Sequence, residues 1–134
     1  MSDSPKINPR AFTYYRRLGK VRDYVERHLS DDLTLKTVAQ VVGLNEKYFS
    51  VFFYERTGVY FREWVNSIRV RRAMELMKAR NYAISDVAFE VGYKDLRTFE
   101  RAFKRQTAMT PREYRRSVQP DLRRDRQKRK ARES

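Results

Sequence analysis

The sequence predicts an all-α fold of seven helices, in which two helix-turn-helix subdomains are joined by a long connecting helix. Apolar residues recur at helical spacing along most of the chain. Two pairs of short amphipathic segments are each divided by a glycine turn, and the second pair repeats the first. With 134 residues, 40% of them hydrophobic, the chain can form one compact domain or two very small ones that share a core.

The internal repeat is the most informative pattern. The apolar and glycine positions of its first copy are Leu35, Val38, Ala39, Val42 and Gly43. Matching residue types recur 49 positions later, at Ile84, Val87, Ala88, Val91 and Gly92. After the glycine the offset becomes 50, and it pairs Phe49 with Phe99, Phe53 with Phe103 and Trp64 with Tyr114. We therefore expect two copies of one helix-turn-helix, with one extra residue in the second turn.

Start and stop signals divide the chain into helices. Asn8-Pro9 is a typical helix start, and Gly43 and Gly58 are typical stops. The seven predicted helices span residues 10–29, 35–42, 45–56, 60–79, 84–91, 95–106 and 111–116. The helix over 60–79 would be about 30 Å long, close to one turn of B-DNA, which is about 34 Å. This length suits a spacer between two DNA-reading helices.

These elements define the predicted domain organisation. Residues 1–9 form a disordered N-terminus, and residues 10–79 form the first helix-turn-helix subdomain together with the connecting helix. Residues 80–117 form the second subdomain. Residues 118–134 form a basic tail, rich in Lys and Arg, that we expect to be disordered.

Charge indicates a polyanionic partner. Lys and Arg number 31 against 17 Asp and Glu, which gives a net charge of +14. Such a field favours nucleic acid over an anionic membrane. The chain has no cysteine, no apolar run near the roughly 20 residues of a membrane span, and no signal-peptide pattern at its N-terminus. We expect a soluble, cytoplasmic protein associated with the nucleoid.

Three sequence pieces in order resemble one known family. DVAFEVGY, AFKRQ and TPREYR, between Asp86 and Arg115, are similar to the DNA-binding domain of the AraC/XylS transcription regulators. The resemblance covers about Tyr14–Arg116 and implies seven helices, two lobes, and two recognition helices that enter adjacent major grooves of double-stranded DNA. It implies a promoter-binding regulator, more often an activator than a repressor, and makes RNA polymerase a candidate partner. The chain resembles the short stand-alone members of the family or an excised fragment.

The second copy carries the basic recognition face. Arg97 and Arg101 are four residues apart and share a helical face, and each suits a bidentate contact with guanine. Lys104 and Arg105 suit phosphate contacts. The resemblance also places Arg112 and Arg115 within reach of phosphate. The predicted DNA-binding residues of this copy are Asp95, Arg97, Arg101, Lys104, Arg105, Arg112 and Arg115.

The first copy carries a different set. Glu46, Lys47 and Ser50 can form hydrogen bonds with base edges, Val51 can pack on a thymine methyl, and Tyr54 can donate its hydroxyl to a phosphate. An exposed Val–Tyr pair could instead contact a protein partner. The family commonly has a basic residue at the position of Val51 and Lys at that of Tyr54. It usually has Gly at the position of Ala108.

No pattern indicates catalysis. The sequence contains no nucleophile–base constellation, phosphate loop or metal-ligand spacing. We therefore predict that the protein is not an enzyme, with no catalytic residue, no metal, no cofactor and no small-molecule site. The leading prediction is a sequence-specific transcription regulator. Charge alone would equally fit a non-specific architectural nucleic-acid-binding protein, which is the alternative.

Overall fold

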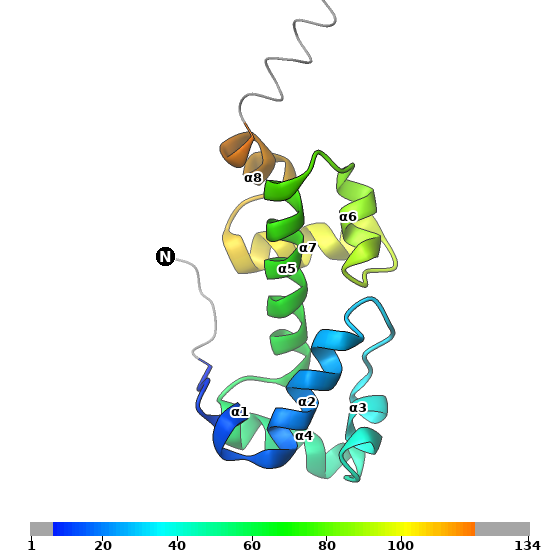
Figure 1. Ribbon diagram of the computed structural model, residues 1–134, viewed down its shortest axis with the longest axis vertical. Coiled ribbons are helices and arrows are strands. Elements are labelled where there is room, and N and C mark those ends of the chain that lie inside the picture. The colour runs from blue at the N-terminus through cyan, green and yellow to red at the C-terminus, as the bar shows by residue number, and fades with distance from the viewer. Residues whose placement is uncertain (1–6, 120–134) are drawn as a thin grey trace, which may run out of the picture. The chain divides into compact units, whose positions relative to one another are not determined.

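The computed structural model describes residues 7–119, in which every regular element is a helix (Figure 1). The helices are α1 Ala11–Tyr14, α2 Arg16–Arg27, α3 Leu35–Val41, α4 Glu46–Thr57, α5 Phe61–Ala79, α6 Ile84–Glu90, α7 Leu96–Thr107 and α8 Pro111–Val118. The all-α prediction is confirmed, but the described residues contain eight helices where the sequence predicted seven. Residues 1–6 and 120–134, including nearly all of the predicted tail, lie outside the described residues.

The extra helix arises because the predicted helix over 10–29 is interrupted. Tyr15 is extended, with φ −98° and ψ 114°, and separates α1 from α2. The bend brings the Phe12 ring onto Trp64, with centroids 5.1 Å apart. It also brings the Phe12 carbonyl to 3.0 Å from the point where a Cβ on Gly19 would lie. Helical periodicity could not reveal this break, because the contact with Trp64 is tertiary.

The chain before α1 also packs on the fold. The Asn8 N–H donates to the Thr57 carbonyl at the end of α4, over 2.8 Å. Residues 7–9 were predicted to be disordered with the rest of 1–9, but they form part of the described structure. This hydrogen bond ties the start of the chain to the end of the helix over 46–57.

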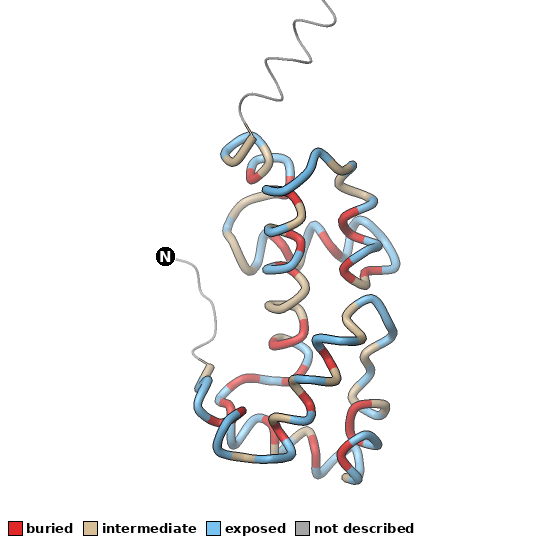
Figure 2. The backbone as a smooth tube through the Cα atoms, viewed as in Figure 1, coloured by how far each residue is buried: buried red, intermediate tan, exposed pale blue. Residues whose placement is uncertain are grey.

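The chain divides into two compact units at a point within α5, between Arg69 and Val70. We call residues 7–69 the first unit and residues 70–119 the second unit. The sequence had instead assigned all of α5 to the first subdomain. The buried residues explain the division, because Trp64 and Val65 belong to the first core while Val70 and Met77 belong to the second. Figure 2 colours the buried positions red along the chain.

Each unit therefore contains more than a helix-turn-helix. In the first unit α2, α3, α4 and the first half of α5 contribute buried side chains to one core. In the second unit the second half of α5, α6, α7 and α8 do the same. The core of each unit thus includes a helical segment before and after the helix-turn-helix, and α5 contributes to both cores.

In both units a side chain on or just after the last helical segment donates to backbone carbonyls near the end of an earlier helix. In the first unit the Arg69 guanidinium donates to the carbonyls of Leu29, over 3.3 Å, and Asp31, over 2.9 Å. In the second unit the Gln119 amide donates to the carbonyls of Met77 and Arg80. Arg69 and Gln119 are 50 positions apart, the offset of the repeat. Gln119 satisfies carbonyls that the end of α5 leaves without intrahelical partners, whereas Leu29 and Asp31 lie in the turn that follows α2.

The turns after α4 and α7 are also built alike. The hydroxyl of Thr57 donates to the Phe53 carbonyl over 2.7 Å, and the hydroxyl of Thr107 donates to that of Phe103 over 2.8 Å. The next residue is left-handed in both units, Gly58 with φ 85° and Ala108 with φ 64°. Ala108 is the one non-glycine residue with positive φ among the described residues. The left-handed conformation crowds a Cβ, so Ala108 is strained where Gly58 is not.

We predict that Ala108→Gly stabilises the protein. Removing the Cβ from a left-handed residue relieves about 1 kcal/mol, which is partly offset by the greater freedom of glycine in the unfolded chain. Thermal unfolding should show a melting temperature higher by a few degrees, on the order of 2–4 °C. The matched variant Gly58→Ala should shift it in the opposite direction. Equal melting temperatures for Ala108→Gly and the parent would contradict the strain assigned to this turn.

Candidate nucleic-acid interface

Helix α7 presents a basic face because its apolar face is fixed in the core. Phe99 and Phe103 are fully buried, while Arg97, Arg101 and Lys104 are exposed on the other side of the helix. This arrangement agrees with the predicted division between buried and outward-facing residues of this helix. Three long cationic side chains on one face can reach both base edges and phosphates of a duplex.

Asp95 has a local role at the start of α7. One carboxylate oxygen accepts the Thr98 N–H over 2.8 Å, and the other accepts the Thr98 hydroxyl over 2.9 Å. These hydrogen bonds lower the pKa of Asp95 below its ordinary value of 3.8, and the nearby charge of Arg101 adds to the effect. Asp95 is thus an N-cap, a role that its position before a basic helix could have indicated. Its predicted contact with DNA stays a prediction.

The last turn of α7 carries the two cations that the sequence assigned to phosphate. Lys104 and Arg105 are exposed and lie where positive charge favours a helix C-terminus. Four cations and one acid, Glu100, give α7 a net charge of +3. The positive charge of α7 therefore suits contact with DNA phosphates.

Helix α4 lies at the corresponding place in the first unit but has a different surface. Asn45 caps its start by accepting the Tyr48 N–H over 2.7 Å, and Phe49 and Phe53 are fully buried. On the outward side Lys47 is exposed and Ser50 is half-buried, and the exposed fractions of Val51 and Tyr54 are 52% and 43%.

The charge of α4 also differs. Lys47 and Arg56 balance Glu46 and Glu55, so the helix has no net charge. Its outward face combines one cation with Val51 and Tyr54, where α7 has three cations. Helices α4 and α7 occupy equivalent places in the two units but differ in surface chemistry.

The sequence analysis did not single out Tyr60, whose exposed ring lies beside the outward face of α4. Its ring stacks on Tyr54 with centroids 4.4 Å apart and planes 26° apart, and 58% of it is exposed. Tyr60 corresponds in the repeat to Thr110, the N-cap of α8. A tyrosine at a position where the other copy has a capping threonine was the signal that could have identified it.

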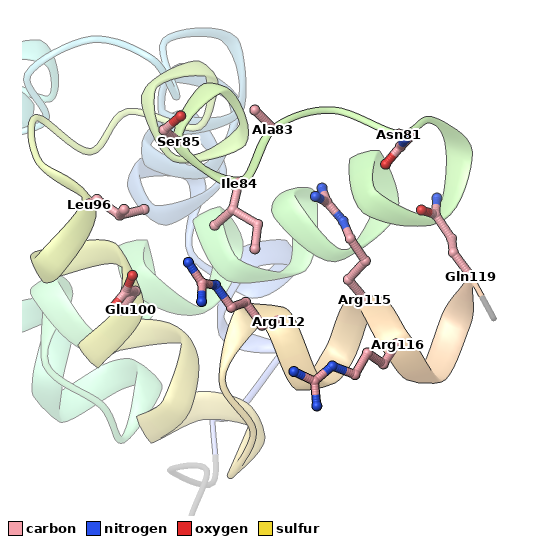
Figure 3. A pocket seen from close by; sticks show the side chains of 10 residues that line it. All are labelled: Asn81, Ala83, Ile84, Ser85, Leu96, Glu100, Arg112, Arg115, Arg116 and Gln119. Atoms are coloured by element: carbon pink, nitrogen blue, oxygen red, sulfur yellow. The ribbon is translucent and has the colours of Figure 1, made fainter. Parts of the chain in front are cut away.

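The two residues of α8 that were predicted to contact phosphate, Arg112 and Arg115, lie in different environments. The Arg115 guanidinium is half-buried and donates to the Tyr82 carbonyl in the turn between α5 and α6. Arg112 is exposed and lines a pocket of about 560 Å³ at the starts of α6, α7 and α8. In Figure 3 its guanidinium extends from α8 toward Leu96 and Glu100 of α7. Arg112 is therefore available to an external anion, whereas Arg115 supports the fold around the 80–83 turn.

The comparison with known families decides what this architecture is. Residues 38–117, more than half of the chain, match a family described as "Helix-turn-helix domain". Solved structures of the same fold include AraC-type DNA-binding domains. The chain belongs to the AraC/XylS family. It contains the DNA-binding domain of an AraC-type transcription regulator.

Relatives within this AraC/XylS family are regulators. The chain is 34% identical over 102 residues to the regulatory protein PocR of Salmonella typhimurium, which covers 76% of the chain. The C-terminal domain of AraT, a response regulator from Geobacillus stearothermophilus, matches with a TM-score of 0.73 and 31% identity over 77% of this chain and 86% of that one. The DNA-binding domain of AdpA, solved in complex with a target DNA, matches with a TM-score of 0.71 and 25% identity over 78% and 97% of the two chains.

The matches cover only part of the curated relatives. The chain spans 34% of the length of PocR and 13% of the length of HTH-type regulators of Staphylococcus aureus. Among residues 7–119, no cluster of three or more metal-ligating side chains could hold an ion. None of the helices described is long and apolar enough to cross a bilayer.

The Asp95 cap leads to a pH prediction. A carboxyl whose pKa is lower in the folded state stabilises that state above its unfolded pKa, and the contribution disappears as the pH falls through the folded pKa. Asn can cap a helix but does not titrate, so Asp95→Asn is the matched variant. The stability advantage of the parent over Asp95→Asn should be constant near neutral pH and should shrink as the pH falls below 3.8.

Urea unfolding of both proteins across the acid range measures this difference. Because Asp95 is exposed, we expect a modest effect that added salt reduces. A difference between the two proteins that does not change with pH would show that the carboxylate charge does not contribute to the cap.

Proposed function

We propose that this chain is a sequence-specific, double-stranded-DNA-binding transcription regulator that inserts α4 and α7 into adjacent major grooves. The observation that supports this most directly is the exposed Arg97, Arg101 and Lys104 face of α7, which the buried Phe99 and Phe103 hold away from the core. Arginine reads guanine O6 and N7 in the major groove, and lysine pairs with phosphate. The repeated scaffold supports a corresponding role for α4.

The remaining parts of the proposal concern the cellular role. We infer an activator that acts at promoters in the cytoplasm, associated with the nucleoid, and RNA polymerase is its candidate protein partner. Family membership supports promoter binding, since PocR is a regulatory protein and AdpA was solved with a target DNA. The net charge of +14 favours rapid association with any duplex, so specificity depends on the recognition helices.

The presence of two helix-turn-helix copies on one chain leads to a prediction of the symmetry and length of the DNA site. The two helix-turn-helix copies repeat in tandem along the chain, and we infer that they read two half-sites in head-to-tail order, without the two-fold symmetry of a site bound by a symmetric dimer. A helix of 19 residues, α5, is about 30 Å long, which suits readers one DNA turn apart.

Selecting bound duplexes from a random pool should therefore enrich an asymmetric site of roughly 20 base pairs, bound by one chain. Specific binding should survive an excess of random duplex at moderate salt. A palindrome bound by two chains would contradict the proposed geometry. If no sequence is enriched, the architectural alternative is correct.

Arg101→Ala should identify the base pair that α7 reads. A bidentate arginine–guanine contact provides about 1–3 kcal/mol of discrimination, so the variant should bind the selected site about fivefold to 150-fold more weakly and lose its preference at one G·C pair. Arg71→Ala, an exposed arginine on α5, removes the same charge and is the matched control.

Binding of both variants is measured on the selected duplex and its single-base mutants at one salt concentration. Arg71→Ala should leave base preference unchanged. If both variants weakened every duplex alike, Arg101 would contact the backbone and would read no base.

A further inference from the structure

The first unit exposes apolar side chains at three positions where the second unit has polar or charged ones. Val51, Tyr54 and Tyr60 expose 52%, 43% and 58% of their surface, and we call these three residues the α4 apolar surface. At the equivalent positions the second unit has Arg101, Lys104 and Thr110. Both units bury the same phenylalanine pair behind this face, so packing does not explain the difference.

Tyr60 takes the place of a helix cap. In the second unit the Thr110 hydroxyl accepts the Glu113 N–H over 3.1 Å, and the Glu113 carboxylate accepts the Thr110 N–H over 3.4 Å, which completes a capping box. The first unit has Glu63 at the equivalent of Glu113, and the Tyr60 carbonyl accepts the Trp64 N–H over 3.0 Å, as a cap residue does. A tyrosine at the N-cap cannot complete a capping box. The first unit therefore has an exposed ring at the position where the second unit has a residue that stabilises the start of a helix.

The Tyr54–Tyr60 stack holds both rings in the exposed position. The centroids are 4.4 Å apart, within the range of favourable aromatic pairs. Two rings held against each other lose little further freedom when a partner contacts them. Lys47 and Ser50 flank Val51 on the same helix and provide donors beside the apolar surface.

The chemistry of the major groove limits what such a surface can contact on DNA. Base edges in this groove present hydrogen-bond donors and acceptors, and the apolar group among them is the thymine C5-methyl. With no net charge, α4 gains little from phosphates, so apolar contact is the main interaction that it offers. We propose that the first unit reads a thymine-rich half-site by burying thymine methyl groups against the α4 apolar surface. This inference rests on the proposed insertion of α4 into the major groove.

Replacing thymine with deoxyuridine tests the contact directly, because it removes the methyl and preserves base pairing. In the selected duplex, the half-site whose preference Arg101→Ala relaxes belongs to the second unit, and the other half-site belongs to the first. Uracil at each thymine of the first half-site should weaken binding about threefold to fourfold for each methyl that is buried. The same substitution in the second half-site should have little effect.

Variants link this methyl effect to the named side chains. In Val51→Ala and in Tyr60→Thr, replacing thymine with uracil should cause a smaller loss of affinity than in the parent, at the thymines that these residues contact. Tyr60→Thr creates a Thr-x-x-Glu capping box with Glu63, so its melting temperature should not fall, and a loss of binding could not be attributed to unfolding. Tyr14→Ser, at a tyrosine on α1 that is 79% exposed, is the matched control and should show the same loss of affinity as the parent.

The outcomes separate this inference from the proposed function. If random-pool selection enriches no site, the proposed function itself fails. If a site is enriched but uracil in the first half-site has no effect, the function stands and the methyl-reading inference is wrong. Normal DNA binding by both Val51→Ala and Tyr60→Thr would likewise overturn it, and the surface would then be assigned to a protein partner.

Discussion

The recognition surfaces of this protein depend on two buried phenylalanine pairs. Phe49 and Phe53 in α4, and Phe99 and Phe103 in α7, are four residues apart and fully buried. Residues at this spacing lie on one face of a helix, so burying both rings determines which residues face outward. The capped helix starts at Asn45 and Asp95 and the threonine-held turns after each helix keep this orientation.

With the orientation fixed, the outward residues can change without changing the fold. In α7 they are cationic and suit guanine and phosphate, whereas in α4 they are largely apolar and the helix has no net charge. Salt should therefore weaken the two contacts unequally, because counterion release accompanies phosphate pairing and not methyl burial. On this account the second unit supplies most of the electrostatic affinity, and the first unit adds discrimination that ionic strength affects little.

Local pattern predicted most of the fold, and tertiary contacts account for what it missed. Periodic apolar residues identified the buried face of each helix and the outward position of Arg101 and Val51, because the face on which a side chain lies depends on its own helix. The break at Tyr15 could not be predicted, since it depends on Phe12 stacking on a ring 52 positions later in the sequence. The half-buried state of Arg115 was missed for the same reason, because its guanidinium contacts the Tyr82 carbonyl, distant in sequence. Tyr60 lay outside the predicted helix over 45–56, and a ring stack on Tyr54 connects it to that surface.

If one repeated scaffold carries two independent readers, exchanging outward residues between the first and second units should exchange what the two units read. The exchanged chain carries Lys47→Arg, Val51→Arg, Tyr54→Lys, Tyr60→Thr, Arg97→Lys, Arg101→Val, Lys104→Tyr and Thr110→Tyr. Its preferred duplex is then selected from a random pool. We predict a folded protein whose two half-sites have changed places relative to the parent site. A folded chain that selects the parent site in its original order would show that these residues do not determine what each unit reads.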